Sequence, residues 1–181
     1  MGAARKPIPV KLFVGMLASG PEHLLAFEQQ LSRAFGPVDL RGEIVSWEHT
    51  SYYASEMGGS LKRRFLFFES LRDPGALANA KQVTNRLEAD SAVMRDGRKR
   101  RVINLDPGYV TEAKVVLATT KDFSHRVYIG EDIYAEVTLK YDKSLSDFLP
   151  LEHTYPDFRT EHARRLFLQA RNMLREALQR K

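Results

Sequence analysis

The hydrophobic positions along the first half of the chain fall into short apolar runs and longer stretches with helical spacing. The short runs predict four strands, at residues 10–17, 43–48, 63–69 and 102–105. Apolar residues at helical spacing predict one helix after the first strand and another that begins at Asp73-Pro74 after the third. This β-α-β-β-α-β order is that of a ferredoxin-like unit, so we predict an α+β fold.

The third of these runs differs from the others because it is apolar at consecutive positions, from Phe65 to Phe68. A strand with one face in water alternates apolar and polar residues, whereas a strand covered on both sides does not. We therefore predict a central strand here.

The second half of the chain predicts an extension of this unit. Helical spacing indicates a short helix over residues 111–120 and a long one over 161–180. Between them, residues 125–141 predict an antiparallel hairpin that turns at Gly130-Glu131-Asp132. We expect one domain over residues 1–181, with residues 1–9 flexible.

The register of the predicted hairpin places specific side chains opposite one another. Tyr128 is expected to face Tyr134, and Arg126 to face Glu136. The two charged residues then lie on the face opposite the apolar one. That apolar face is predicted to be buried and consists of Val127, Ile129, Ile133, Ala135, Val137 and Leu139.

Composition excludes several classes of site. The chain has no cysteine, which excludes disulfides, thiolate metal sites and a cysteine nucleophile, and which fits a reducing cytoplasm. No apolar run approaches the roughly 18 residues of a transmembrane helix, so we expect no membrane association. The oligomeric state is left open.

The net charge of +5 is unevenly distributed along the chain. Residues 102–157 are acidic, while the segments on either side are basic. Such asymmetry is typical of a protein that binds phosphates or nucleic acid, but it also fits a basic helix packed beside an acidic sheet face.

Sequence motifs for common chemistries are missing. There is no Walker loop, GxGxxG, HExxH or GxSxG pattern. The two-histidine phosphoesterases need two H-x-[ST] motifs, and only His49-Thr50-Ser51 matches.

The stretch from Asp106 to Glu136 is the most informative for function, and we expect a phosphate-bearing ligand to bind near Asp106 to Lys121, close to Arg126. Asp106 follows a predicted strand, at the end where ligands gather in α/β proteins, although Asp-Pro-Gly is also an ordinary turn sequence. A helix capped by Thr111 would offer free N–H groups to an anion. Lys114 and Lys121 would share one face of that helix.

These observations predict a protein that binds or processes a phosphate-bearing ligand, either a nucleotide or RNA. Asp106 and Glu136 are the candidate acid or base residues. The candidate ligand-binding residues are Arg64, Lys81, Tyr109, Lys114, Lys121, His125, Arg126 and Tyr128. No residue is assigned to a metal, and the cofactor is left open.

Two other classes of function stay open. A non-enzymatic interaction or scaffold module would explain why no catalytic motif is present. A metal-dependent hydrolase would require Asp106, Glu136, Asp157 and a histidine to converge.

Eleven short stretches, spread over almost the whole chain, together resemble one known family. They are residues 11–15, 52–53, 56–58, 61–65, 81, 84–85, 104–109, 117–121, 125–128, 133–137 and 154–159. The chain resembles a bacterial family known as domain of unknown function 4416. The resemblance implies a single cytosolic domain and assigns no role to any residue.

Overall fold

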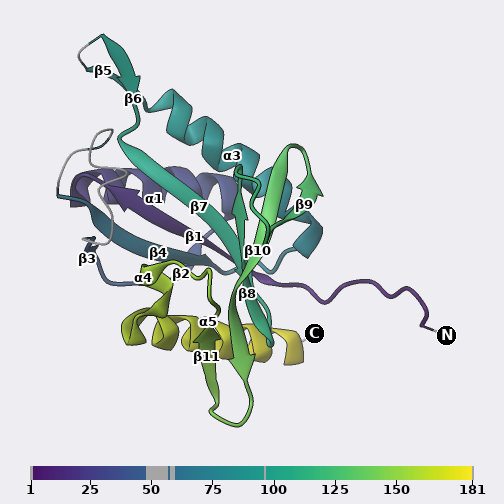
Figure 1. Ribbon diagram of the computed structural model, residues 1–181. Helices are drawn as coiled ribbons and strands as arrows, with labels where there is room; N and C mark the ends of the chain where they lie inside the picture. Colours follow the sequence, from purple (N-terminus) through teal and green to yellow (C-terminus); the bar gives the residue numbers. More distant parts are fainter. Residues whose placement is uncertain (1, 48–56, 58–59, 96, 181) are drawn as a thin grey trace.

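The computed structural model describes residues 2–47, 57, 60–95 and 97–180 (Figure 1). Its strands are β1 Lys11–Ala18, β2 Val38–Arg41, β3 Val45–Ser46, β4 Lys62–Phe68, β5 Val93–Arg95, β6 Arg98–Arg100, β7 Ile103–Val110, β8 Lys114–Thr119, β9 Val127–Gly130, β10 Ile133–Asp142 and β11 Asp147–Pro150. Its helices are α1 Pro21–Phe35, the 3-10 helix η1 Pro74–Ala76, α3 Leu77–Asp90, α4 Pro156–Arg159 and α5 Glu161–Gln179.

The strands form one large antiparallel sheet and one separate hairpin. The order in the large sheet is β11-β10-β8-β7-β1-β4-β2, with β3 added to β4 and β9 added to β10. The hairpin β5–β6 projects away from the rest of the molecule (Figure 1). Mixed helices and antiparallel strands confirm the predicted α+β class.

Helices cover both faces of the sheet. On one face, Leu12, Val14 and Met16 of β1 pack in a cluster that includes the apolar sides of α1 and α3. On the other face, Phe13 packs with Phe167 of α5, their ring centroids 5.0 Å apart. The alternation along β1 therefore divides the core into two layers.

Strand β4 is central, as its unbroken apolar run predicts. It lies between β1 and β2, and the four residues from Phe65 to Phe68 are all buried. Leu66 and Phe68 point to the α1 side, whereas Phe65 and Phe67 point to the α5 side. The predicted C-terminal helix is also confirmed in α5, which ends within one residue of the expected position.

The predicted helix over residues 111–120 is wrong, because this segment is strand β8. Its four apolar residues are buried alternately on the two faces of the sheet: Val115 and Leu117 pack in the α5 layer, and Val116 and Ala118 pack against α3. Thr111 therefore caps no helix. Its hydroxyl accepts hydrogen bonds from the Lys114 and Ala113 amides in the β7–β8 turn.

Two other strand boundaries differ from the prediction. The expected second strand at residues 43–48 is replaced by β2 and the very short β3, because the chain pairs with β4 in two separate pieces. The fourth strand continues beyond its predicted end through Asp106-Pro107-Gly108, so Asp106 lies inside β7 and not in a turn. The motif at His49 and the aromatic pair Tyr52-Tyr53 lie outside the described residues.

The hairpin β9–β10 is partly as predicted. Tyr128 pairs with Tyr134, but the turn consists of only Glu131 and Asp132, both with positive φ. The predicted burial of β9 is wrong: Val127 is 64% exposed because this strand lies at the edge of the sheet without a covering helix. Beyond a bulge in β10, Leu139 is buried on the opposite face from Ile133.

Across the described ranges, none of the helices has the length and apolar character that crossing a membrane requires.

Candidate functional site

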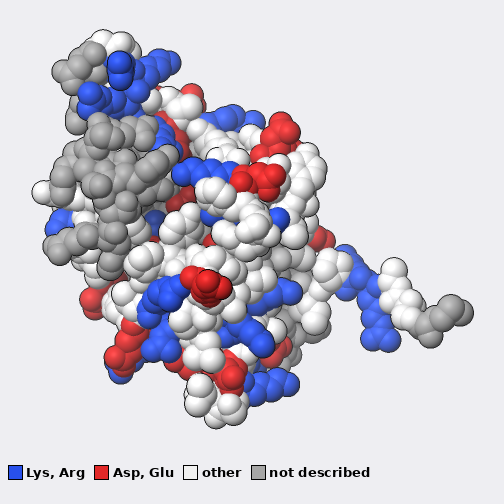
Figure 2. All heavy atoms as spheres, viewed as in Figure 1, with Lys and Arg blue, Asp and Glu red and all other residues white. Residues whose placement is uncertain are grey.

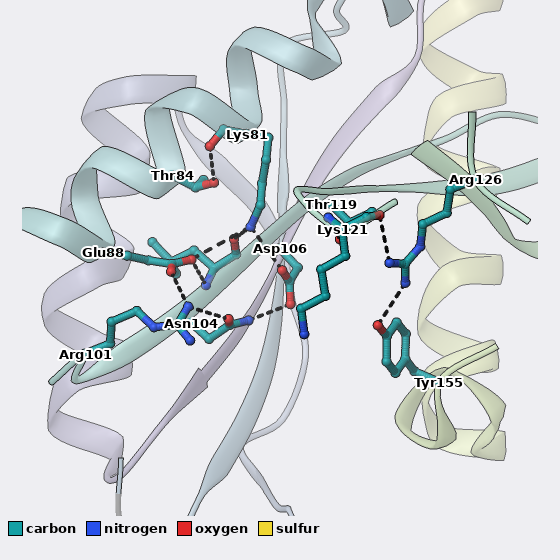
Figure 3. Close-up of polar contacts among 11 residues, drawn as sticks. Lys81, Thr84, Glu88, Arg101, Asn104, Asp106, Thr119, Lys121, Arg126 and Tyr155 are labelled. Carbon is teal, nitrogen blue, oxygen red and sulfur yellow. Dashed lines mark hydrogen bonds and ion pairs between the residues drawn. The ribbon is translucent and has the colours of Figure 1, made fainter. Parts of the chain in front are cut away.

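Strands β7 and β8 separate halfway along their length, and this opening forms the site. They pair only from Gly108 to Val110 of β7. At Leu105, two side chains of α3 replace the missing strand: the Leu105 amide donates to Glu88 Oε1 at 2.7 Å, and the Leu105 carbonyl accepts from Lys81 Nζ at 2.8 Å (Figure 3). Pro107 faces the same side and lacks the N–H that further pairing with β8 would need.

The opening contains a pocket of about 510 Å³. Its walls come from β1, β4, α3, β7, the end of β8 and the segment around α4. The charged and amide side chains that line it are Arg63, Lys81, Asn85, Glu88, Arg101, Asn104, Asp106, Lys121 and Asp157. The aromatic ones are Trp47, Tyr155 and Phe158.

Asp106 is held in the pocket wall by two polar neighbours. Lys81 Nζ lies 3.2 Å from its Oδ1, and Asn104 Nδ2 donates to its Oδ2 at 2.6 Å. Burial alone would raise the pKa of Asp106, but the charges of Lys81 and Arg63 and these hydrogen bonds together lower it below the ordinary value. Asp106 is therefore a carboxylate at neutral pH.

A glycine lets Arg63 approach this carboxylate. Gly15 of β1 lies between β4 and β7, paired with Asp106 on one side and Phe65 on the other. A Cβ atom there would lie 2.6 Å from Nη2 of Arg63. The missing side chain thus leaves room for the guanidinium to cross β1.

A buried ion pair ties Arg63 to the opposite wall of the pocket. Arg63 Nε lies 2.9 Å from Asp157 Oδ2 of α4, and both side chains are almost fully buried. Burial raises the pKa of Asp157, although the charge of Arg63 opposes the shift. The guanidinium also lies over the Phe65 ring, 4.7 Å from its centroid.

Glu88 of α3 lies between two cations of the pocket, Lys81 and Arg101. Glu88 is buried, which raises its pKa against the effect of Lys81 3.9 Å away. Arg101 Nη1 donates to the other carboxylate oxygen of Glu88 at 2.9 Å. Every one of these charges thus has an oppositely charged neighbour, which fixes its position before any ligand arrives.

Arg126 and Glu136 lie side by side as the hairpin register predicts, with Arg126 Nε 2.7 Å from Glu136 Oε2. Both side chains are at most 2% exposed. Arg126 also donates to the Lys121 carbonyl at 3.0 Å and to the Tyr155 hydroxyl at 3.1 Å (Figure 3). It therefore lies behind the pocket and positions two parts of its wall.

The structure brings together some of the candidate residues and separates others. Asp106, Lys81 and Lys121 line the pocket. Arg64 points to the opposite face of β4, where it pairs with Glu28 of α1. The rest lie elsewhere: Tyr109 lines a smaller cavity beside α3, Lys114 and Tyr128 are exposed, and His125 contacts Glu136.

Several pocket residues were not among the sequence candidates, Arg63 first among them. Arg63 lies in the basic run Lys62-Arg63-Arg64 that begins the central strand, and the signal that could have found it is that a strand covered on both faces buries some of its charged residues, which then need partners. The convergence that a metal-dependent hydrolase would need does not occur, because Asp106 and Asp157 line the pocket while Glu136 does not.

A group of three side chains that could bind a metal ion lies outside the pocket. His125, Glu136 and His153 each offer one ligand atom, and these atoms lie within 4.8 Å of one another. The two histidine rings stack at a centroid distance of 4.2 Å.

Almost the whole chain, including the pocket, matches one known protein family. The profile of the family described as "Domain of unknown function (DUF4416)" matches residues 8–174. The chain belongs to this family. The match confirms the resemblance seen in the sequence, and its range includes every residue that lines the pocket. Comparison with curated proteins and with solved structures gives no match.

Proposed function

We propose that the pocket binds a small phosphate-bearing ligand, and that a nucleotide fits its lining best. The observation that carries this proposal is the convergence of four cationic side chains from four segments on one pocket: Arg63, Lys81, Arg101 and Lys121. Cationic side chains that are already positioned are the usual partners of phosphate oxygens. A volume of about 510 Å³ suits a small molecule of nucleotide size.

The remaining lining matches the other parts of a nucleotide. The Asp106 carboxylate can accept hydrogen bonds from a ligand hydroxyl or amino group. Tyr155 is 40% exposed and offers an aromatic surface on which a base can stack. A simple inorganic anion would contact the cations but would use neither of these two groups.

The surrounding surface adds a positive field. Lys and Arg side chains gather on the β5–β6 hairpin (Figure 2), where Arg98 and Lys99 are exposed. Arg101, one residue beyond β6, lines the pocket. A positive patch beside a pocket raises the local concentration of anionic ligands.

The fold is consistent with a ferredoxin-like unit, which we propose as the core of the molecule. Its support is the antiparallel order β7-β1-β4-β2, with α1 and α3 packed in one layer against β1. Strands β8 to β11 and helix α5 extend this unit, and β8 supplies the far wall of the pocket.

Substitution of Lys121 tests the proposal. We expect Lys121→Ala to weaken nucleotide binding about tenfold or more, because a hydrogen bond between two charged groups contributes about 1.5–3 kcal/mol. Isothermal titration with ATP, GTP, CTP and UTP measures the effect. Lys121 is exposed, so the fold should tolerate the change.

Lys114→Ala is the matched control, since Lys114 is also exposed and lies at the opposite end of the strand that precedes Lys121. It should bind like the wild type, and nucleosides without phosphate should bind much more weakly than the nucleotides. The proposal is wrong if no nucleotide binds to the wild type, or if the two lysine variants bind equally.

A further inference from the structure

Three side chains behind the pocket wall, from His125, Glu136 and His153, offer ligand atoms that lie close together. We propose that His125, Glu136 and His153 bind one divalent transition-metal ion, such as Zn²⁺, through two imidazole nitrogens and one carboxylate oxygen. The residues come from separate parts of the chain: the segment before β9, the middle of β10 and the segment before α4. Two imidazoles and one carboxylate are a common ligand set for such ions.

The distances suit a single ion. Two ligands that lie about 2.0–2.1 Å from a tetrahedral Zn²⁺ are about 3.3 Å apart. The Glu136 carboxylate already lies beside His125, whose Nε2 is 3.2 Å from its Oε2. The largest separation in the group is within 4.8 Å, so at most a shift of about 1.5 Å brings His153 into place.

A hydrogen bond to the backbone leaves one ring nitrogen of His153 free of hydrogen, so that it can bind a metal ion. Its Nε2 lies 3.0 Å from the carbonyl oxygen of Val137. A carbonyl only accepts, so this nitrogen carries the hydrogen, and the neutral ring keeps its lone pair on Nδ1. Metal-bound histidines usually donate their second ring N–H to a carbonyl or carboxylate in this way.

Glu136 supplies an independent observation. Its side chain is 1% exposed, yet Oε1 has no hydrogen-bond partner among the described residues. A buried carboxylate oxygen without a partner is costly, and a bound cation would satisfy it. The other oxygen, Oε2, is fixed by Arg126 at 2.7 Å, which orients the carboxylate.

The charge of Arg126 also limits which ions can bind. It partly neutralises Glu136, so binding depends on the two imidazoles more than on charge attraction. Nitrogen ligands favour Zn²⁺ and Co²⁺ over Mg²⁺ and Ca²⁺, which prefer oxygen. Arg126 also contacts the Lys121 carbonyl and the Tyr155 hydroxyl. An ion bound to Glu136 would therefore stabilise the pocket wall through Arg126.

Metal titration of the full chain tests the site without any nucleotide. After treatment with a chelator, the wild type should bind one Zn²⁺ per chain by isothermal titration, and Co²⁺ should give visible absorption bands of a low-symmetry site. Binding should weaken below about pH 6, because imidazole must be deprotonated to coordinate. Mg²⁺ should not compete.

The variant His125→Gln/His153→Gln should lose about 100-fold or more in Zn²⁺ affinity. His162→Gln, which changes an exposed histidine on α5, is the control and should bind like the wild type. If the double variant is misfolded by circular dichroism, the single His125→Gln variant replaces it, with a loss of about tenfold expected. The site does not exist if the wild type takes up no Zn²⁺, or if the folded variant binds Zn²⁺ as well as the control.

Discussion

Replacing Arg126 with methionine should destabilise the protein by about 3–5 kcal/mol, the usual cost of removing one partner of a buried ion pair. The Glu136 carboxylate would remain buried without its cation. The Lys121 carbonyl and the Tyr155 hydroxyl would each lose a donor as well. Urea denaturation in the presence of a chelator, so that no metal contributes, measures the loss.

Two further variants separate the ion pair from simple loss of packing. Arg126→Met/Glu136→Leu should recover most of the stability, because an apolar pair can replace a buried ion pair at little net cost. Arg165→Met removes an exposed pair with Glu161 and should change stability very little. If Arg126→Met is as stable as Arg165→Met, the buried pair does not have the importance assigned to it.

Phe167→Ala should cost about 3–5 kcal/mol, the range for removing a fully buried aromatic ring. Phe167 is 0% exposed, and its ring lies within 5.5 Å of those of Phe13, Phe65, Phe67 and Phe158. It therefore joins α5 to three strand residues and to α4 at once. The loss should appear as a lower denaturation midpoint with an unchanged slope.

Leu25→Ala is a suitable comparison, since Leu25 is an apolar residue on α1 that is 55% exposed. It should leave stability nearly unchanged. A similar loss in both variants would mean that α5 is not packed against the sheet as described.

The parts of the fold that the sequence predicts correctly are those with an unambiguous hydrophobic pattern. The run from Phe65 to Phe68 is too long and too apolar for an edge strand, and the stripe on α5 persists through the whole helix. The segment at Val115-Val116 is different, because four apolar residues fit a buried strand as well as a short helix. Its two adjacent β-branched residues favoured the strand.

The site was predictable only in part, because it depends on which face of a strand a residue occupies. Arg63 and Arg64 are neighbours in β4, so they point to opposite faces of the sheet. Arg63 reaches the pocket, and Arg64 pairs with α1. A shift of one residue in the pairing register of β4 would turn Arg64 toward the pocket and Arg63 toward α1. The hydrophobic pattern of the sequence does not fix that register.

The role of Lys81 shows a second limit. It lies away from the main apolar stripe of α3, which in sequence reads as a solvated position. Only the separation of β7 from β8 creates the unpaired edge at Leu105 that Lys81 and Glu88 bind. The reason for that separation, a proline inside a strand, reads in sequence as the start of a turn.

An NMR titration of the labelled wild-type protein with whichever of the four nucleoside triphosphates binds tightest tests the central claim most directly, because it locates the ligand. We predict that the largest amide shifts fall at residues 104–106, 117–121 and 155–158, which border the pocket on three sides. Shifts confined to the β5–β6 hairpin, or no shifts at saturating nucleotide, would contradict the assignment of the pocket as a nucleotide site.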